Sequence, residues 1–302
     1  MKNLFSRPWL RLALIGLGIL IALVAMLVGI GLILAQHKAD RRMHVAVAAI
    51  DVPDDDKSRA RGRYLYESRG CADCHAADGG GRVFVDAGDV FLAGPDITGG
   101  GRSARYRSQD WVRAVRHGLA PGGRPLRVMP SEDYNRLTDV DLASIVAYVR
   151  SLPPRDGAAG ELRLPLPARV LYGFGVLDDA ADRIDHSLPP EAPVAEAASV
   201  AHGRYVAQLC VACHGPGFSG GKIPGAPPDW PASANLTPGE GGVMARYGDA
   251  QAFAKMMRGG KRPDGSAITV MPFEALAKMN DTDLEAMRLY LATLPARPAG
   301  SR

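Results

Sequence analysis

The sequence of 302 residues contains little cysteine, and beyond Ala39 it has no excess of either charge. The N-terminal segment 1–39 holds Lys2, Arg7, Arg11 and Lys38 and no acidic side chain, so it accounts for the whole net charge of +4. A neutral remainder offers no basic patch for phosphate backbones, which excludes nucleic acid as an expected partner. The length suits two domains of about 100 to 150 residues each and one additional segment.

Only four cysteines occur, with no thiol left over, and each C-x-x-C pair is followed at once by a histidine. The two motifs consist of Cys71, Cys74 and His75, and of Cys210, Cys213 and His214. Two thiols on one turn of helix can each form a thioether with a haem vinyl group, which leaves the next histidine to face the iron. A zinc ribbon would need pairs about 15 to 20 residues apart, and a thioredoxin-like motif would occur once in a βαβ pattern. The motifs predict two covalently attached haems c.

The two motifs lie in two copies of one longer pattern. Gly62-Arg-Tyr64 precedes the first motif, and Gly203-Arg-Tyr205 precedes the second. Beyond the motifs one constant offset aligns Trp111 with Phe253, Gly118 with Gly260, Asp141 with Asp283, and Tyr148 with Tyr290. Two copies are too few for a solenoid, so the repeat predicts a duplicated domain.

A methionine at matched positions predicts the sixth iron ligand in each copy. Met129 and Met271 each precede a proline and obey the same offset. The second copy also contains Met244, Met256, Met257, Met279 and Met287, none of which has a partner methionine in the first copy. His117 is the rival ligand in the first copy, but its counterpart is Gly259, so a capping or surface role is expected. Since thioether sulfur favours ferrous iron, paired His and Met ligands predict closed sites of positive potential.

The segment from Leu12 to Leu34 has no charged or polar side chain over 23 residues. As a helix it would rise about 35 Å, against roughly 30 Å of hydrocarbon in a bilayer. Secretory signal peptides have shorter apolar cores of about 7 to 15 residues, so we expect an uncleaved transmembrane anchor. Ala46-Val47-Ala48 leaves cleavage open as the alternative.

Within each copy the pattern is helical. Thr138 and Asn280 are candidate N-caps for a final helix, which Pro153 and Pro295 would end. Between motif and methionine the chain is rich in Gly and Pro and lacks a core, which a bound haem would supply. We therefore predict an all-α fold, with an anchor over 1–39, a solvated spacer over 40–57, a first domain over 58–153, a linker over 154–197 and a second domain over 198–302.

Several segments resemble those of class I cytochrome c domains, and more closely those in the multihaem cytochrome subunits of bacterial membrane-bound alcohol and gluconate dehydrogenases. They are Cys71–His75, Asp96-Ile-Thr98, Trp111–Arg116, Met129-Pro130 and 137–142, with the second-copy matches Asn235–Pro238 and Met271-Pro272. The resemblance covers about 58–153 and 198–296. It departs from that family in having two haem motifs where those subunits carry three, and in its N-terminal anchor.

The resemblance implies that a proline carbonyl accepts a hydrogen bond from the proximal histidine. Pro95 is the candidate in the first copy, while Pro231 and other residues remain open in the second. It also implies that residues from 40 onward lie in the periplasm, because bacterial c-type cytochromes receive their haem outside the cytoplasm.

Together these patterns predict a single-pass protein of the bacterial inner membrane, with a cytoplasmic N-terminus and periplasmic haem domains. It would carry electrons, without catalytic residues, between a dehydrogenase or quinol-oxidising partner and an oxidase or soluble cytochrome. The alternative is a di-haem enzyme of the peroxidase or thiosulfate-oxidising type. Such an enzyme would keep one iron open or give it an unusual ligand, and here neither copy lacks its methionine. A gas sensor would need an output domain beyond the two copies.

Overall fold

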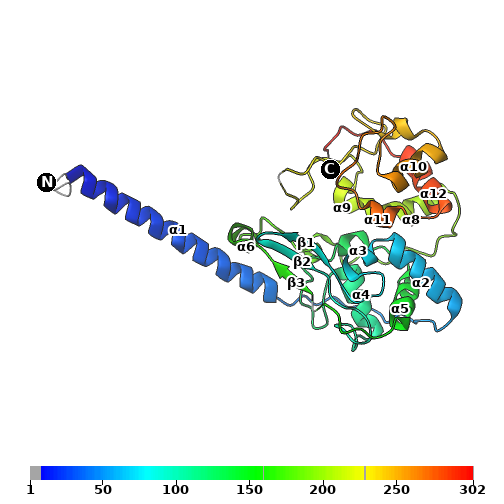
Figure 1. Ribbon diagram of the computed structural model, residues 1–302, viewed down its shortest axis with the longest axis horizontal. Coiled ribbons are helices and arrows are strands. Elements are labelled where there is room, and N and C mark those ends of the chain that lie inside the picture. Colours follow the sequence, from blue (N-terminus) through cyan, green and yellow to red (C-terminus); the bar gives the residue numbers. More distant parts are fainter. Residues whose placement is uncertain (1–7, 159, 228, 302) are drawn as a thin grey trace.

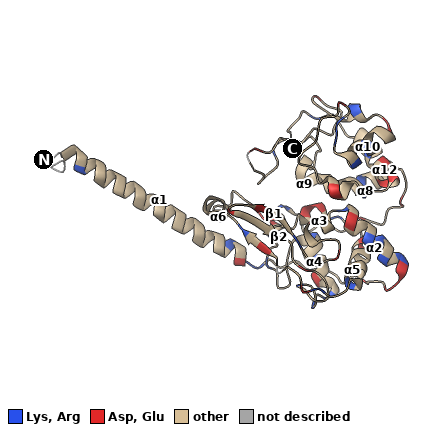
Figure 2. Ribbon diagram, in the orientation of Figure 1, with Lys and Arg blue, Asp and Glu red and all other residues tan. Residues whose placement is uncertain are grey.

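A long N-terminal helix leads into two helical halves (Figure 1). The computed structural model describes residues 8–158, 160–227 and 229–301. Helix α1 spans Pro8–Asp40 and, within these ranges, is the one helix long and apolar enough to cross a membrane. Figure 2 shows that α1 carries charged side chains only near its ends. This agrees with the apolar helix expected from the sequence.

The two halves share a common order of helices, to which the second half adds short 3-10 turns. The first consists of α2 (Asp56–Ser68), α3 (Cys71–His75), α4 (Ser108–His117), η2 (Ser131–Asp133) and α5 (Asp139–Ser151). The second consists of α8 (Val200–Val206), η3 (Ala207–Cys210), α9 (Val211–His214), η4 (Met244–Tyr247), α10 (Ala250–Gly259), α11 (Phe273–Leu276) and α12 (Asp281–Ala292). The offset that aligns the two copies places α4, η2 and α5 on α10, α11 and α12. The predicted duplication is confirmed, and the fold predicted as all-α is mostly helical with few strands.

In each half the first and last helices cross at a glycine. A Cβ atom on Gly62 would lie 1.9 Å from the carbonyl oxygen of Ser144, and one on Gly203 would lie 1.8 Å from that of Ala286. Backbones this close leave space for a hydrogen atom alone. The crossing therefore explains why glycine stands in both Gly-Arg-Tyr segments.

The last helix of each half begins at its predicted cap. The Thr138 side chain accepts a hydrogen bond from the Asp141 amide, and the Asn280 side chain accepts one from the Asp283 amide. These caps satisfy backbone donors that the helix itself leaves unpaired. Behind them the apolar face enters the core, where Leu142 has no exposed surface.

A small antiparallel sheet is the element that the sequence does not predict. Strands β1 (Val83–Ala87) and β2 (Val90–Ala93) form a hairpin around Gly88-Asp89, and β3 (Glu161–Arg163) pairs with β2. Gly88 has a φ of +60°, as two-residue hairpin turns require. The sheet therefore joins the first half to chain from beyond α5.

The segment 40–57 is not the solvated stalk that the sequence suggests. It lies against the first half, where Ile50 joins the core with 8% of its surface exposed. The Met43 amide donates to the Gly123 carbonyl oxygen at 2.9 Å. Apolar side chains between the charged ends of this segment supply the burial that holds it there.

The segment 154–197 contains β3 and two short helices, α6 (Leu166–Gly173) and α7 (Ala180–Arg183). Helix α6 packs against α1, and α7 contacts η2. The chain between the halves is therefore tied to both α1 and the first half along its course.

Candidate haem sites

The first C-x-x-C-H motif forms the short helix α3, which begins after Gly70 in a left-handed conformation with φ of 80°. The Nδ1 atom of His75 lies 2.9 Å from the carbonyl oxygen of Pro95 and donates to it, as expected from the resemblance. Burial lowers the pKa of His75, so its imidazole is neutral. A neutral ring with Nδ1 engaged presents Nε2 as a metal ligand.

The second motif repeats this geometry with a different acceptor. The Nδ1 atom of His214 lies 2.8 Å from the carbonyl oxygen of Ala234, so Pro231 does not take that role. Ala234 follows His214 by 20 residues, the same interval that separates Pro95 from His75. A backbone carbonyl can belong to any residue type, so only this spacing could have identified the acceptor.

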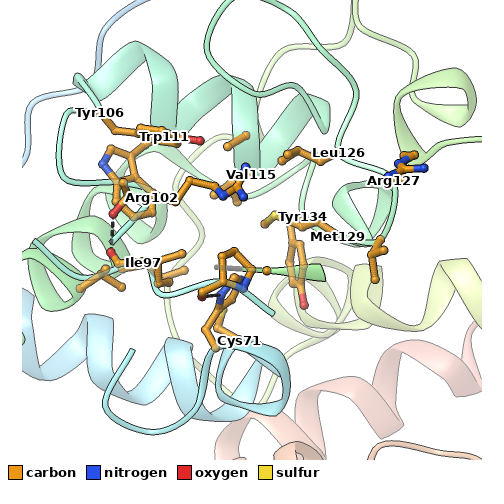
Figure 3. Close-up of a pocket in the computed structure, with 18 of the residues that line it drawn as sticks. Cys71, Ile97, Arg102, Tyr106, Trp111, Val115, Leu126, Arg127, Met129 and Tyr134 are labelled. Carbon is orange, nitrogen blue, oxygen red and sulfur yellow. Dashed lines mark hydrogen bonds between the residues drawn. The ribbon is translucent and has the colours of Figure 1, made fainter. Parts of the chain in front are cut away.

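His75 and Met129 line one cavity of about 270 Å³ in the first half (Figure 3). The walls are mostly apolar, and α4 and α5 supply several of them, including Trp111, Val115 and Ile145. A histidine and a methionine that are distant in the sequence but face one apolar cavity suit the two axial positions of a haem iron.

The indole N–H of Trp111 supplies a separate test of fit. It is buried at the wall of the cavity and has no hydrogen-bond partner within the described chain. Buried donors are seldom left unpaired unless a ligand satisfies them. A haem propionate is an acceptor of the kind this indole requires, so the residues present fit the group.

Burial disfavours the thiolate form of three of the four cysteines. It raises the pKa of Cys71 and of Cys210 to about 12, and that of Cys74 to about 11. All four cysteines are free of disulfides. Redox-active C-x-x-C pairs instead depend on a lowered thiol pKa. The arrangement therefore favours attachment of a cofactor over thiol–disulfide exchange.

In the second half Met271 lies against the core together with Cys210. Four of its five rivals are buried core residues of α10, α12 and the turn before α12: Met256, Met257, Met279 and Met287, each at most 7% exposed. Met244 packs against the same core from η4. Core packing accounts for these residues, and Met271 keeps the position that matches Met129.

His117 does not line the cavity with His75. Its Nδ1 lies 3.0 Å from Nδ1 of His186, and burial together with that neighbour lowers the pKa of His117 to about 4. The residue is 9% exposed and the C-cap of α4 is Gly118, so the expected capping or surface role is wrong. It packs instead against the chain that follows α7.

The small sheet helps to close the first cavity. Ala93 at the end of β2, with Gly160, Glu161 and Leu162 at β3, lines the cavity beside the helical residues. Sequence reasoning missed these four residues because β3 comes from a segment with no periodicity. Gly88-Asp89 is a turn sequence that could have predicted the β1–β2 hairpin, but it does not identify β3 as the second partner of β2.

The two halves meet through reciprocal contacts between matched residues. The Tyr64 hydroxyl donates to Asp283 at 2.7 Å, and the Tyr205 hydroxyl donates to Asp141 at 2.7 Å. Likewise α11 contacts α3, while η2 contacts α9. Each helix that follows a methionine therefore packs against the haem motif of the other half.

Asp283 is the most constrained charge at this interface. Its side chain is fully buried and accepts from Arg69 at 2.6 Å and from His202 at 2.7 Å. Burial opposes its charged form, yet the hydrogen bond from His202 and the charge of Arg69 hold the pKa of Asp283 below its usual range. The sequence shows Asp283 as a repeated residue but does not reveal this partner set.

Two helical halves, each bringing a C-x-x-C-H motif and a methionine to a buried site, define an electron-transfer protein with covalent haem. The chain belongs to the cytochrome c family, whose model matches residues 59–153 and again residues 200–295. It accordingly carries two haems c.

Relatives include the fructose dehydrogenase cytochrome subunit of Gluconobacter japonicus, 27% identical over 80% of this chain and 53% of that protein. The gluconate 2-dehydrogenase cytochrome c subunit of Pantoea cypripedii is 25% identical over 83% of this chain and 63% of that protein. A diheme cytochrome c-type protein of Cereibacter sphaeroides is 26% identical over 78% of this chain and 86% of that protein. The chain thus spans between half and two thirds of the two dehydrogenase subunits.

Proposed function

We propose that this cytochrome is a membrane-anchored relay that moves electrons on the periplasmic side of the bacterial inner membrane. Its donor would be a dehydrogenase or quinol-oxidising partner, and its acceptor an oxidase or soluble cytochrome. One observation carries the proposal: His75 and Met129 face the same cavity, and the second half has His214 and Met271 at matching positions. Iron held on both sides has no open position for a substrate, which favours electron exchange over catalysis.

The residues that would hold each haem follow from the repeat. The thioethers would form at Cys71, Cys74, Cys210 and Cys213, and the axial ligands would be His75 with Met129 and His214 with Met271. The bound haems supply the ferric and ferrous couple. The chain supplies neutral imidazoles, soft thioether sulfur that favours the ferrous state, and apolar walls that keep water away.

The division of the chain remains part of the proposal. Residues 58–153 and 198–302 would be the haem domains, connected by 154–197, and residues 1–39 would form a single-pass anchor with a cytoplasmic N-terminus. The uncharged middle of α1 supports the anchor. The names of the two dehydrogenase subunits support a dehydrogenase partner.

Binding of carbon monoxide to the reduced full-length protein tests the ligand assignment. The unaltered protein should bind none rapidly, because His and Met would occupy both ligand positions of each iron. Met129→Ala and Met271→Ala should each open one site and bind one equivalent. Met244→Ala serves as the matched control and should bind none. Rapid binding by the unaltered protein, or by the control alone, would overturn the assignment.

Two experiments test the anchor and the partner. If α1 spans the bilayer, the protein should stay with membranes through an alkaline carbonate wash, and release by that wash would contradict the anchor. A dehydrogenase should copurify with the protein from membranes solubilised in mild detergent. Copurification with an oxidase only would place the electron donor elsewhere.

A further inference from the structure

Apolar side chains collect on α6 and the turn that follows it. Beyond α1, the described chain exposes ten large apolar side chains, and four of them fall within residues 166–176. These four are Leu166, Leu171, Phe174 and Val176, exposed by 49%, 44%, 46% and 64%. We call them the α6 apolar surface. Single exposed apolar residues are ordinary, but a group of four on one short segment suggests a contact.

The position of α6 along α1 is fixed by two glycines. A Cβ atom on Gly173 would lie 2.0 Å from the carbonyl oxygen of Gly31, and one on Gly31 would lie 2.8 Å from Cγ1 of Val170. The two backbones therefore touch, as at close helix crossings in membranes. Neither helix can slide along the other without a collision.

The contact at Gly31 lies inside the apolar part of α1. The apolar segment runs from Leu12 to Leu34, so Leu23 is its midpoint. Gly31 follows that midpoint by two turns of helix, or about 12 Å, whereas half a hydrocarbon layer is about 15 Å. If α1 spans a bilayer as proposed above, the crossing lies at the edge of the hydrocarbon.

Ion pairs hold the following chain at the same end of α1. Lys38 Nζ donates to the Leu177 carbonyl oxygen at 2.7 Å and to Asp178 at 3.1 Å. Arg41 pairs with Asp179 at 2.9 Å and with Asp182 at 2.7 Å. The glycine crossing and these pairs thus fix the height of α6 and the following turn on α1, and Figure 1 shows α6 beside the C-terminal part of α1.

A polar cavity adjoins this surface. It has a volume of about 640 Å³ and lies between the last turns of α1, the β1–β2 turn and α6. Its walls include Arg127, Arg163 and Arg169 against one acidic residue, Asp89. Arginine beside an apolar helix face is the pattern of segments that lie in the lipid headgroup region.

We propose that α6 and the turn after it form a second membrane contact, in which the α6 apolar surface enters the acyl boundary of the bilayer. Arg127 and Arg169 would face phospholipid phosphates, whereas Arg163 already pairs with Glu161 at 2.8 Å. The first haem domain would be held at a fixed height above the membrane. Interfacial helices bury about 5–10 Å into this region, in agreement with the position of the crossing. The inference rests on the proposed anchor, and its test separates the two.

Spin labels on the full-length holoprotein in phosphatidylcholine–phosphatidylglycerol vesicles test the contact. Phe174→Cys and Val176→Cys place labels on the α6 apolar surface, because the native cysteines would be occupied by haem. Leu20→Cys reports on α1, and Val140→Cys, at a site 61% exposed on α5, is the aqueous control. Haem absorbance verifies that each variant folds.

Collision with oxygen and with a water-soluble nickel chelate then gives the depth of each label. Labels at 174 and 176 should show an oxygen-to-nickel ratio several-fold above that at 140 and approaching that at 20. A lipid-like ratio at 20 with ratios at 174 and 176 equal to that at 140 would overturn the contact and leave the anchor standing. A water-like ratio at 20 would overturn both. Labels at 174 and 176 shielded from both reagents would mean that protein covers the surface, and would also overturn it.

Discussion

Replacement of Asp283 by Asn should destabilise the interface between the two halves strongly, although the two side chains have nearly the same size. The change keeps the shape of the side chain but removes the counter-charge of Arg69, whose side chain is 3% exposed. The new amide would also place an N–H donor against Arg69 and Tyr64 or against His202, all of which now donate to Asp283. Breaking one partner of a buried pair costs about 3–5 kcal/mol, because the other charge stays buried and uncompensated.

A neighbouring aspartate supplies the control. Asp281 lies two positions earlier in α12 and pairs with Arg258 at 2.6 Å, but its side chain is 85% exposed. Exposed pairs of this kind contribute about 0–1 kcal/mol. Asp281→Asn therefore makes the same chemical change at a site where solvent compensates for the loss.

Urea denaturation of the full-length protein in detergent, followed by far-ultraviolet circular dichroism, measures both variants. With a slope of about 1–3 kcal/mol per molar urea, the Asp283→Asn midpoint should fall by about 1 M or more, and that of Asp281→Asn by much less. Equal shifts for the two variants would refute the reasoning. Combining Asp283→Asn with Arg69→Met should recover part of the loss, because no unpaired charge then remains.

The pH dependence of this effect has a definite sign. The pKa of Asp283 is lowered in the folded protein relative to its ordinary value of 3.8. The stability that its charge contributes is therefore fully present above that value and lost as the pH falls below it. The gap between the unaltered protein and Asp283→Asn should narrow on acidification below about pH 4.

Three further predictions concern single sites. Trp111→Phe should lower the reduction potential of one haem, because a propionate would lose its N–H donor. Spectroelectrochemical titration measures the potential, and the control Trp230→Phe should leave it unchanged. Unchanged potentials in Trp111→Phe would exclude the hydrogen bond. Gly62→Ala should lower the midpoint temperature of thermal unfolding, since its Cβ would lie 1.9 Å from a carbonyl oxygen. Gly259 has open space around it, so Gly259→Ala should not lower that temperature. Equal midpoint temperatures for the two variants would contradict the helix crossing. Burial raises the pKa of Asp133 to about 8, so the free energy of unfolding should fall as the pH rises from about 4 to 8. Asp133→Asn should flatten this pH dependence in thermal unfolding. An unchanged slope in the variant would assign the pH dependence to another group.

Much of the fold could be predicted because the two copies have the same residue types at matched positions. The glycines of the two Gly-Arg-Tyr segments mark helix crossings, and the caps Thr138 and Asn280 stand where a last helix must begin. Each signal depends on local geometry that few residue types can adopt. A motif with such requirements is visible without any knowledge of the rest of the chain.

Features made by distant partners were not predictable in the same way. Strand β3 exists because it pairs with β2, and its own short sequence carries no distinguishing pattern. The Ala234 carbonyl that holds His214 could belong to any residue. The partners of Asp283 come from α2, α8 and the residue just beyond α2, which only the assembled structure brings together.

Duplication explains why the halves fit one another. A surface that complements its own copy produces a reciprocal interface, in which each favourable contact is made twice. The Tyr64–Asp283 and Tyr205–Asp141 bonds are such a pair, and each joins the start of one half to the last helix of the other.

The symmetry between the halves fails at two charges, Arg61 and Arg69. Asp141 is held by Arg61 of its own half, in the place where Asp283 has His202. Arg69 stands two positions before the first haem motif, and the residue two positions before the second motif is the uncharged Gln208. The reciprocal bonds therefore set the orientation of the two halves. Of the two unmatched arginines, Arg69 is the more deeply buried, which makes Asp283, and not Asp141, the side where the interface is most sensitive to substitution.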